Sequence, residues 1–292
     1  MKKIFIHADD FGNSQHISEC IYKCFEKGAL NSTSIIVNSD CLDDSLKLIK
    51  DRKIRKVLHL NIVEGKAISK RKFKYLTDRF GNFHRSWQRV VLEYYALCTQ
   101  AKRELIKQEI KEEYKSQILL YCEKLQTKDI NIDSHQHFHM IPFITDILVE
   151  LKEEMDINIL NIRVTKERFF CSISSFGDLK NYLGINFFVH FLLNYLSKKM
   201  ITKFDKLGIN YNDAFIGVLF SGDMTLKAVQ KGLEKVQSAK TIEILLHPGS
   251  LSQDEKPKFK DDEFKRFYTS KNRKKEMRVL LNSELKGIIN DF

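Results

Sequence analysis

Residues 3–12 read KIFIHADDFG, a short apolar run that ends in two adjacent carboxylates. The isoleucines and the phenylalanine predict a strand over Lys3–Ala8, and the pattern that follows predicts a helix over about His16–Lys27. A strand followed by a helix is the first half of a βαβ unit, the building block of folds with a parallel sheet. This opening stretch therefore sets the class of fold, and the rest of the chain repeats its order.

Apolar runs and helical patterns alternate along most of the sequence. About seven strands alternating with helices favour an α/β fold, and 292 residues suit one α/β barrel, so we expect a single domain over residues 1–292. Residues 168–212 show no clear pattern of strands and helices. We interpret the aromatic run Phe187–Phe191 within them as a buried helix. The other predicted strands are Ser32–Asn38, Lys56–Val63, Ile130–His135, Asn158–Val164, Ala214–Ser221 and Thr241–His247; the other predicted helices are Leu42–Lys50, Trp87–Leu125, Phe143–Met155 and Arg273–Ile289.

Composition excludes several classes of protein. With 43% hydrophobic and 30% charged residues the chain can build a large core, which excludes wholesale disorder. Three prolines and twelve glycines are too few for low-complexity segments. The N-terminus lacks an apolar secretion signal, and the most apolar stretch, Phe187–Leu193, is too short to span a membrane. Six cysteines without C-x-x-C spacing are interpreted as reduced, mostly buried thiols, so we expect a cytoplasmic protein.

The formal net charge of +11 permits a second class of function. A basic surface can bind nucleic acid, and the histidines would then be incidental. The basic residues are, however, interleaved with 38 acidic ones and form only short runs, such as Lys70–Lys72. We interpret them as solvated helix faces and expect neither nucleic acid nor a membrane as a partner.

Residues suited to catalysis fall at the ends of five predicted strands. In an α/β barrel these ends meet at one mouth, which holds the active site. Chance alone would rarely place aspartate, histidine and arginine at the ends of five separate strands. The sequence therefore predicts that these side chains converge in one site. They are Asp9 and Asp10, His59, Asp133 with His135, His137 and His139, Arg163, and His247.

These residue types support metal-assisted hydrolysis. Two neutral imidazoles and one carboxylate can hold a divalent ion that lowers the pKa of bound water and polarises a carbonyl. A second carboxylate could take the proton of the water, and a histidine opposite could protonate the leaving group. Asp9 and Asp10 suit the first two carboxylate roles because neighbours on a strand point in different directions. On a strand His135, His137 and His139 would share a face, whereas in a helix only the first and third would.

Each candidate also has a purely structural interpretation. The aspartate pair could form a turn or cap a helix, and His247 before Pro248 could be a turn residue. Arg163 could simply pair with an acid across the mouth, and one or two of the three clustered histidines could serve as hydrogen-bond partners behind the ligands. The remaining histidines, His7, His16, His84 and His190, are assigned to structure.

Several motifs bring the sequence close to a known family. In chain order they are residues 7–12 (HADDFG), 33–38 (TSIIVN), 58–61 (LHLN) with 64–65 (EG), 133–139 (DSHQHFH) and 246–249 (LHPG). Together they resemble the successive motifs of the YdjC-like carbohydrate deacetylases, which remove acetyl groups from N-acetylated sugars such as chitooligosaccharides. Residues 76–83, and Arg273 with Glu276 and Leu280, extend the likeness. Leu58 stands where the family commonly has glycine, and residues 168–212 match poorly, so sugar specificity is expected to be decided there.

The resemblance implies roles for the strand-end residues. Asp10, His59 and His135 become the metal ligands, Asp9 the general base and His247 the acid. An acid must be protonated in the complex, so the pKa of His247 would have to be raised, for example by Asp133. Substrate binding or support of the ligands is left to Arg163, Asp133, His137 and His139.

The resemblance also implies a fold and an activity. We expect a deformed, TIM-like (β/α) barrel that binds magnesium or zinc, acts on an N-acetylated sugar and forms a homodimer. The expected function is that of a metal-dependent carbohydrate deacetylase. The alternative enzyme is a metal-dependent hydrolase of another amide or ester on the same scaffold.

Overall fold

Seven parallel strands form one curled sheet in the computed structural model, which describes residues 2–173, 176–256 and 262–292. The order β5-β4-β3-β2-β1-β7-β6 places the first strand near the middle, between β2 and β7. This arrangement confirms the predicted TIM-like α/β fold. The strands are β1 (Lys3–Phe11), β2 (Ser32–Ile35), β3 (Arg55–Leu60), β4 (Asp129–Ser134), β5 (Asn158–Ile162), β6 (Ala214–Ile216) and β7 (Thr241–Leu246).

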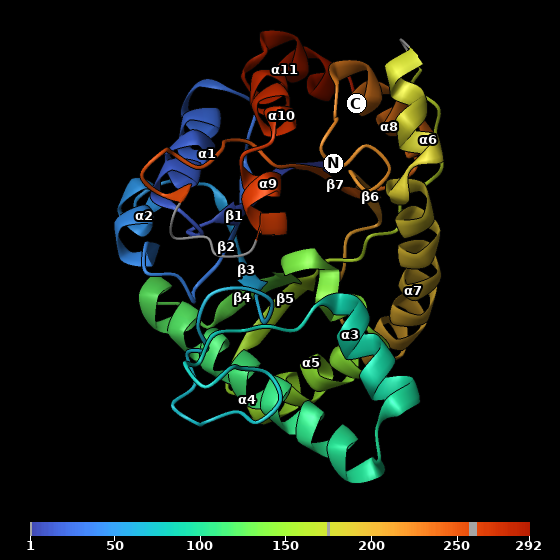
Figure 1. The fold of residues 1–292 in the computed structure, drawn as a ribbon. Coiled ribbons are helices and arrows are strands. Elements are labelled where there is room, and N and C mark those ends of the chain that lie inside the picture. Colours follow the sequence, from blue (N-terminus) through green and yellow to red (C-terminus); the bar gives the residue numbers. More distant parts are fainter. Residues whose placement is uncertain (1, 174–175, 257–261) are drawn as a thin grey trace.

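Helices surround the sheet, with α1 and α2 at the left of Figure 1, α4 and α5 below and α7 at the right. Most follow a strand, as the βα repeat predicts. The long helices are α1 (Gln15–Lys27), α4 (Gln100–Leu125), α5 (Pro142–Glu154), α7 (Ile185–Leu207), α8 (Leu226–Lys235) and α10 (Lys271–Leu281); the shorter ones are α2 (Leu42–Ile49), α3 (Trp87–Leu92), η1 (Glu93–Leu97), η2 (His135–Met140), η3 (Phe176–Leu179), α6 (Lys180–Leu183), α9 (Asp262–Tyr268) and α11 (Ser283–Asn290).

The barrel is deformed because β5 and β6 are the two edges of the sheet. Irregular chain spans the gap between them. The Ile162 amide donates to the Asn210 carbonyl at 3.0 Å, and the Phe215 amide donates to the Lys166 carbonyl at 3.0 Å. Arg163 directly follows β5, so this stretch carries a candidate site residue to the open side of the barrel.

Two buried glutamates of α4 hold the long loop between β3 and α3. Glu109 accepts hydrogen bonds from the amides of residues 74–76 at 2.7–3.0 Å, and Glu113 from those of Ile68 and Ser69 at 3.0 Å. Carboxylates on the buried face of a helix would be costly without such partners. They fix the loop that begins directly after the His59-bearing strand.

Several predicted elements differ from the observed ones. The helical tract at 87–125 is divided into α3, η1 and α4, and the C-terminal helix breaks at Asn282, whose side chain caps α11. The strand predicted at 214–221 ends at Ile216, because the next residue, Gly217, has a φ of +143°, and a Cβ at this position would lie only 2.9 Å from the Leu245 carbonyl oxygen. In each case a local cap or close contact ends an element that apolar periodicity alone would extend.

Two predictions of burial were wrong. The run Phe187–Phe191 is helical, but Phe188 is 67% exposed and Phe191 55% exposed, while His190 is buried. All six cysteines are free as predicted, yet only Cys24 is buried. Within the described part of the chain, no helix is both long and apolar enough to cross a membrane.

Candidate active site

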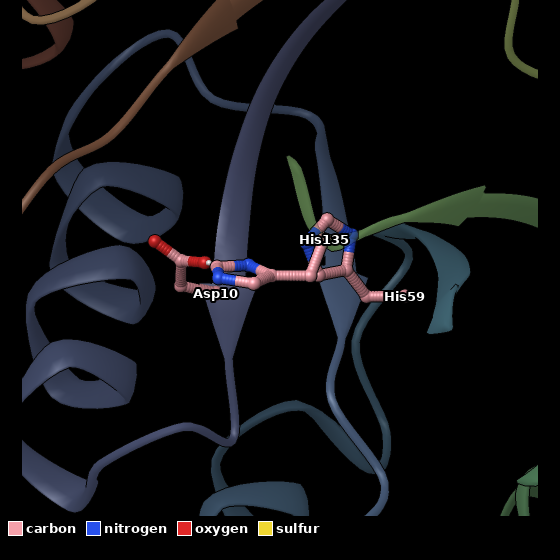
Figure 2. Close-up of side chains that lie close together, drawn as sticks. All are labelled: Asp10, His59 and His135. Atoms are coloured by element: carbon pink, nitrogen blue, oxygen red, sulfur yellow. Dashed lines mark ion pairs between the residues drawn. The ribbon is translucent and has the colours of Figure 1, made fainter. Parts of the chain in front are cut away.

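Three of the predicted residues converge at the carboxyl ends of β1, β3 and β4. Ligand atoms of Asp10, His59 and His135 all lie within 4.8 Å of one another, and all three residues are buried. Figure 2 shows their side chains pointing toward one another from separate segments. We call these three residues the open cluster.

Asp10 reaches this cluster through a bulge in β1. Its φ of +73° is the left-handed conformation, and the register with β2 shifts between Ala8 and Phe11. Asp9 and Asp10 therefore contact different partners, as predicted. The guanidinium of the buried Arg273 donates to Asp10 Oδ2 at 2.9 Å. Burial raises the pKa of Asp10, but His135 and Arg273 outweigh it, and the pKa falls below its usual range.

His59 is oriented by Asp133. Its Nδ1 lies 2.7 Å from Asp133 Oδ1, while its Nε2 is buried and has no hydrogen-bond partner among the described residues. Burial lowers the pKa of His59, but the charges of Asp133 and Asp9 outweigh it and raise the pKa. In metal-binding histidines one ring nitrogen usually contacts a carboxylate, and the lone pair of the other nitrogen is free to bind the ion.

The three clustered histidines point to three places, because the chain after β4 is neither strand nor α-helix. Gln136 and His137 have φ near +50°, so the backbone of η2 turns sharply between His135 and His139. Only His135 joins the open cluster. The ring of His137 packs edge-on against Phe215, 6.1 Å away between ring centroids.

His139 connects two strands. Its Nδ1 pairs with the Ser134 hydroxyl at 2.6 Å, and its Nε2 with the Arg163 carbonyl at 3.0 Å. Burial lowers its pKa to about 4, so the ring is neutral near pH 7. Burial also holds the pKa of His137 well below its usual range. Both residues lie outside the open cluster, and His139 ties the end of β4 to the residue that follows β5.

A second group of possible ligands lies beside the first. His7, Asp9 and Asp133 also bring their ligand atoms within 4.8 Å of one another. Here, however, the Arg163 guanidinium occupies the centre. It donates to both oxygens of Asp9 at 2.8 and 3.0 Å, and its Nη2 lies 2.6 Å from Asp133 Oδ2. We call these residues, with Arg163, the filled cluster.

The filled cluster belongs to a buried network of ion pairs centred on Arg163. Arg163 is 1% exposed and also donates to Glu243 at 2.5 Å, so one cation faces three carboxylates. Burial raises the pKa of Asp9, but Arg163 and His59 outweigh it and hold that pKa well below its usual range. Asp9 is therefore ionised near pH 7. The pairing of Arg163 with an acid across the mouth is observed.

His247 lies at the end of β7, near the open cluster, and its side chain is 12% exposed. Its neighbour is Glu276, which accepts the His247 amide at 2.6 Å and lies 3.7 Å from Nδ1. The expected partner, Asp133, is instead shared by His59, Ser34 and Arg163. The carboxylate beside His247 is therefore Glu276, and the contacts of Asp133 are with other residues.

Four residues in contact with the two clusters were missed or given no role by sequence reasoning. His7 had been assigned to structure, yet its Nε2 lies 3.1 Å from Asp9 Oδ1. Its position two residues before Asp9 on a strand could have indicated a shared face. Glu243 is a charged residue inside an otherwise apolar strand, which also signals a buried partner. Glu64 and Arg273 occurred only as parts of the family motifs.

The open cluster fits a divalent metal ion. It offers one carboxylate and two imidazoles, a donor set suited to zinc and similar ions. The buried Nε2 atom of His59 lacks a hydrogen-bond partner among the described residues, which would be costly unless it faces a ligand. The filled cluster does not fit, because the Arg163 guanidinium already contacts both oxygens of Asp9 and one oxygen of Asp133.

The YdjC-like protein family model matches residues 3–291. Curated relatives named carbohydrate deacetylase include one from Xenopus laevis, 25% identical over 270 residues (87% of this chain, 83% of the relative). Another, from Brevibacillus brevis, is 24% identical over 292 residues (99% of this chain, 95% of the relative). A solved structure from Enterococcus faecalis, named for cellobiose-phosphate cleavage, has a TM-score of 0.69 at 16% identity and covers 99% of this chain and 94% of that chain. This last likeness concerns the fold alone. The match over nearly the whole sequence shows that the chain belongs to the YdjC-like protein family.

Proposed function

We propose that this protein is a metal-dependent carbohydrate deacetylase that hydrolyses the acetamide of an N-acetylated sugar. The observation that carries the proposal is the open cluster, a buried set of one aspartate and two histidines at the strand ends of a YdjC-like chain. The relatives named carbohydrate deacetylase support the reaction and the class of substrate.

We assign Asp10, His59 and His135 as the ligands of one divalent ion, either magnesium or zinc. When bound, such an ion supplies Lewis-acid polarisation of the acetyl carbonyl and lowers the pKa of water. Around it, Arg273 holds the free oxygen of Asp10, and Asp133 holds the Nδ1 proton of His59. These contacts leave each ligand one orientation.

Asp9 is proposed as the general base. The Arg163 guanidinium keeps its carboxylate ionised and fixes its position beside the open cluster. The same guanidinium makes Asp9 a weaker base than a carboxylate whose pKa is raised. Asp9 would therefore contribute mainly through its fixed position beside the open cluster. Because Arg163 is buried behind Asp9, we assign it to support of the base rather than to the substrate.

His247 is proposed as the acid that protonates the leaving nitrogen. It approaches from β7, on the side opposite the strands that carry the two histidine ligands. Its Nδ1 is buried without a hydrogen-bond partner in the described structure, 3.7 Å from Glu276 Oε2. Glu276 also accepts the His247 amide, so it fixes the position of this residue at the end of β7.

We further propose a cytoplasmic enzyme of one domain, working as a homodimer, with sugar specificity set by residues 168–212. One continuous hydrophobic core over the described residues supports the single domain. The free cysteines suit a reducing compartment. Another amide or ester substrate, or a nucleic acid, is not favoured by the family and its relatives.

The proposal is tested by measuring acetate release from N-acetylated mono- and oligosaccharides after adding Mg²⁺, Mn²⁺, Co²⁺ or Zn²⁺ to the metal-free protein. Release is expected with at least one ion and one sugar, and His59→Ala is expected to abolish it. His84→Ala is the matched control, because His84 is exposed and lies outside both clusters. Salt-dependent DNA binding without any acetate release would contradict the proposal.

A further inference from the structure

The Glu64 side chain lies behind the open cluster, in the chain that follows β3. It is about 10% exposed, and its Oε1 is held from two sides. The Tyr268 hydroxyl donates to Oε1, and Asn13 Nδ2 donates to it at 3.3 Å. These donors come from α9 and from the turn after β1, so two distant segments fix one carboxylate oxygen of a third.

That oxygen faces His135. Glu64 Oε1 lies 3.5 Å from His135 Nε2, and Asp10 Oδ1 lies 3.5 Å from His135 Nδ1, on the other side of the ring. Both distances exceed an ordinary hydrogen bond, but such contacts in active sites commonly shorten when the ligand binds. One nitrogen of His135 therefore faces a proposed fellow ligand, and the other faces a carboxylate outside the cluster.

His59 shows the same arrangement with its two nitrogens exchanged. Asp133 contacts its Nδ1 at 2.7 Å, which leaves Nε2 for the ion. Metal-binding histidines usually donate their other ring proton to a carboxylate or a carbonyl, which fixes the tautomer and the ring orientation. At His135 the carboxylate stands at Nε2, which leaves Nδ1 beside Asp10.

We propose that Glu64 is the positioning residue of His135, and that it makes His135 bind the ion through Nδ1 while His59 binds through Nε2. The inference rests on the proposed metal site and assigns Glu64 no contact with the ion or the substrate. Each of the three ligands then has one buried charged partner: Arg273 for Asp10, Asp133 for His59 and Glu64 for His135.

The first test measures the affinity of the metal-free protein for Zn²⁺ by competition with a chromogenic chelator. Glu64→Gln keeps the size of the side chain but removes its charge, and the affinity is expected to fall by about 10- to 100-fold. Glu113→Gln is the matched control, because Glu113 is also buried and holds a loop, but it contacts Ile68, Ser69 and Gln117. Equal affinities for wild type and Glu64→Gln would overturn the inference while leaving the metal site intact.

The second test needs no variant. Protein labelled with ¹⁵N-histidine and loaded with ¹¹³Cd²⁺ should show one-bond cadmium–nitrogen coupling to one Nδ1 and one Nε2. Coupling to two Nε2 atoms would overturn the inference although the metal site stands. A wild-type chain that binds neither Zn²⁺ nor Cd²⁺ would overturn the metal site and this inference with it.

Discussion

The open and filled clusters lie side by side, and Asp133 of the filled cluster orients His59 of the open one. They differ in how a guanidinium contacts them: Arg273 contacts one oxygen of Asp10, whereas Arg163 contacts both oxygens of Asp9 and one of Asp133. Each gathers three possible ligands within 4.8 Å. In the open cluster the buried Nε2 atom of His59 lacks a hydrogen-bond partner among the described residues. In the filled cluster Arg163 contacts both aspartates. Proximity of ligand types is therefore not enough to identify a metal site; the nearest cation decides whether the ligands are available.

The difference also explains how neighbouring aspartates can take different roles. Asp10 faces the imidazole of His135, while Asp9 faces Arg163, and the bulge in β1 separates them. Both are buried and ionised near pH 7, so their charges alone do not distinguish them. The partners of the two carboxylates distinguish them.

Replacing Arg163 by methionine is expected to have the largest effect. It leaves Asp9, Asp133 and Glu243 buried without their shared cation, and breaking a buried ion pair costs about 3–5 kcal/mol of the free energy of unfolding. Urea unfolding measures this loss. Arg55→Met is the control, because it removes a more exposed partner of the same Glu243, 3.1 Å away, and should cost less. Equal losses for the two variants would show that the filled cluster has no special dependence on Arg163.

Asp9→Asn separates the two aspartates functionally. The amide keeps the shape but cannot accept a proton, so turnover is expected to fall by roughly 10²- to 10⁴-fold while the ion stays bound. Metal content and acetate release are measured on the same preparation. Asp10→Asn is the paired variant and should lose the ion. The opposite result, with metal lost from Asp9→Asn and kept in Asp10→Asn, would reverse the two roles.

The neutral His139 makes stability depend on pH. Its pKa in the folded state is about 4, below the 6.5 of an unperturbed histidine. As the pH falls through this window the unfolded state takes up a proton first, so the stabilisation present above pH 6.5 is lost toward pH 4. The loss is on the order of 3 kcal/mol.

Because other groups titrate in the same range, the measured quantity is the difference between wild type and His139→Gln. Urea unfolding in the presence of a chelator at several pH values should show a shallower acid-side decline for the variant. Parallel curves would mean that His139 is not held neutral by burial.

His247→Ala is expected to have the smallest effect. Loss of a general acid should lower acetamide turnover by about 10²-fold, the low end for proton transfer, because water can partly replace it. An activated acetate ester, whose leaving group needs the proton less, should lose less activity, and the ion should remain bound. Equal losses on both substrates would reduce His247 to a structural residue.

Sequence reasoning predicted the fold well because strands buried on both faces leave strong apolar runs. It also placed Asp10, His59 and His135 at strand ends that the fold brings together. It could not separate His135 from His139, since that depends on the left-handed turn at Gln136 and His137. Nothing in a spacing of alternate histidines signals such a turn.

Sequence reasoning allowed Arg163 to pair with an acid across the mouth, but it could not assemble the whole filled cluster, for a different reason. Its charges come from β1, β4, β7 and the residue after β5, so no short motif contains it. The exposed aromatic residues of α7 were likewise misjudged, since apolar side chains at Phe188 and Phe191 give the same pattern whether or not anything covers them. In both cases the missing information is which segments pack together.

The most direct test of the account is anomalous X-ray diffraction from crystals of the protein soaked in Zn²⁺. The account predicts one strong peak bounded by Asp10, His59 and His135, and none among His7, Asp9 and Asp133. A peak in the second group, or beside His137 or His139 with the first group empty, would contradict it.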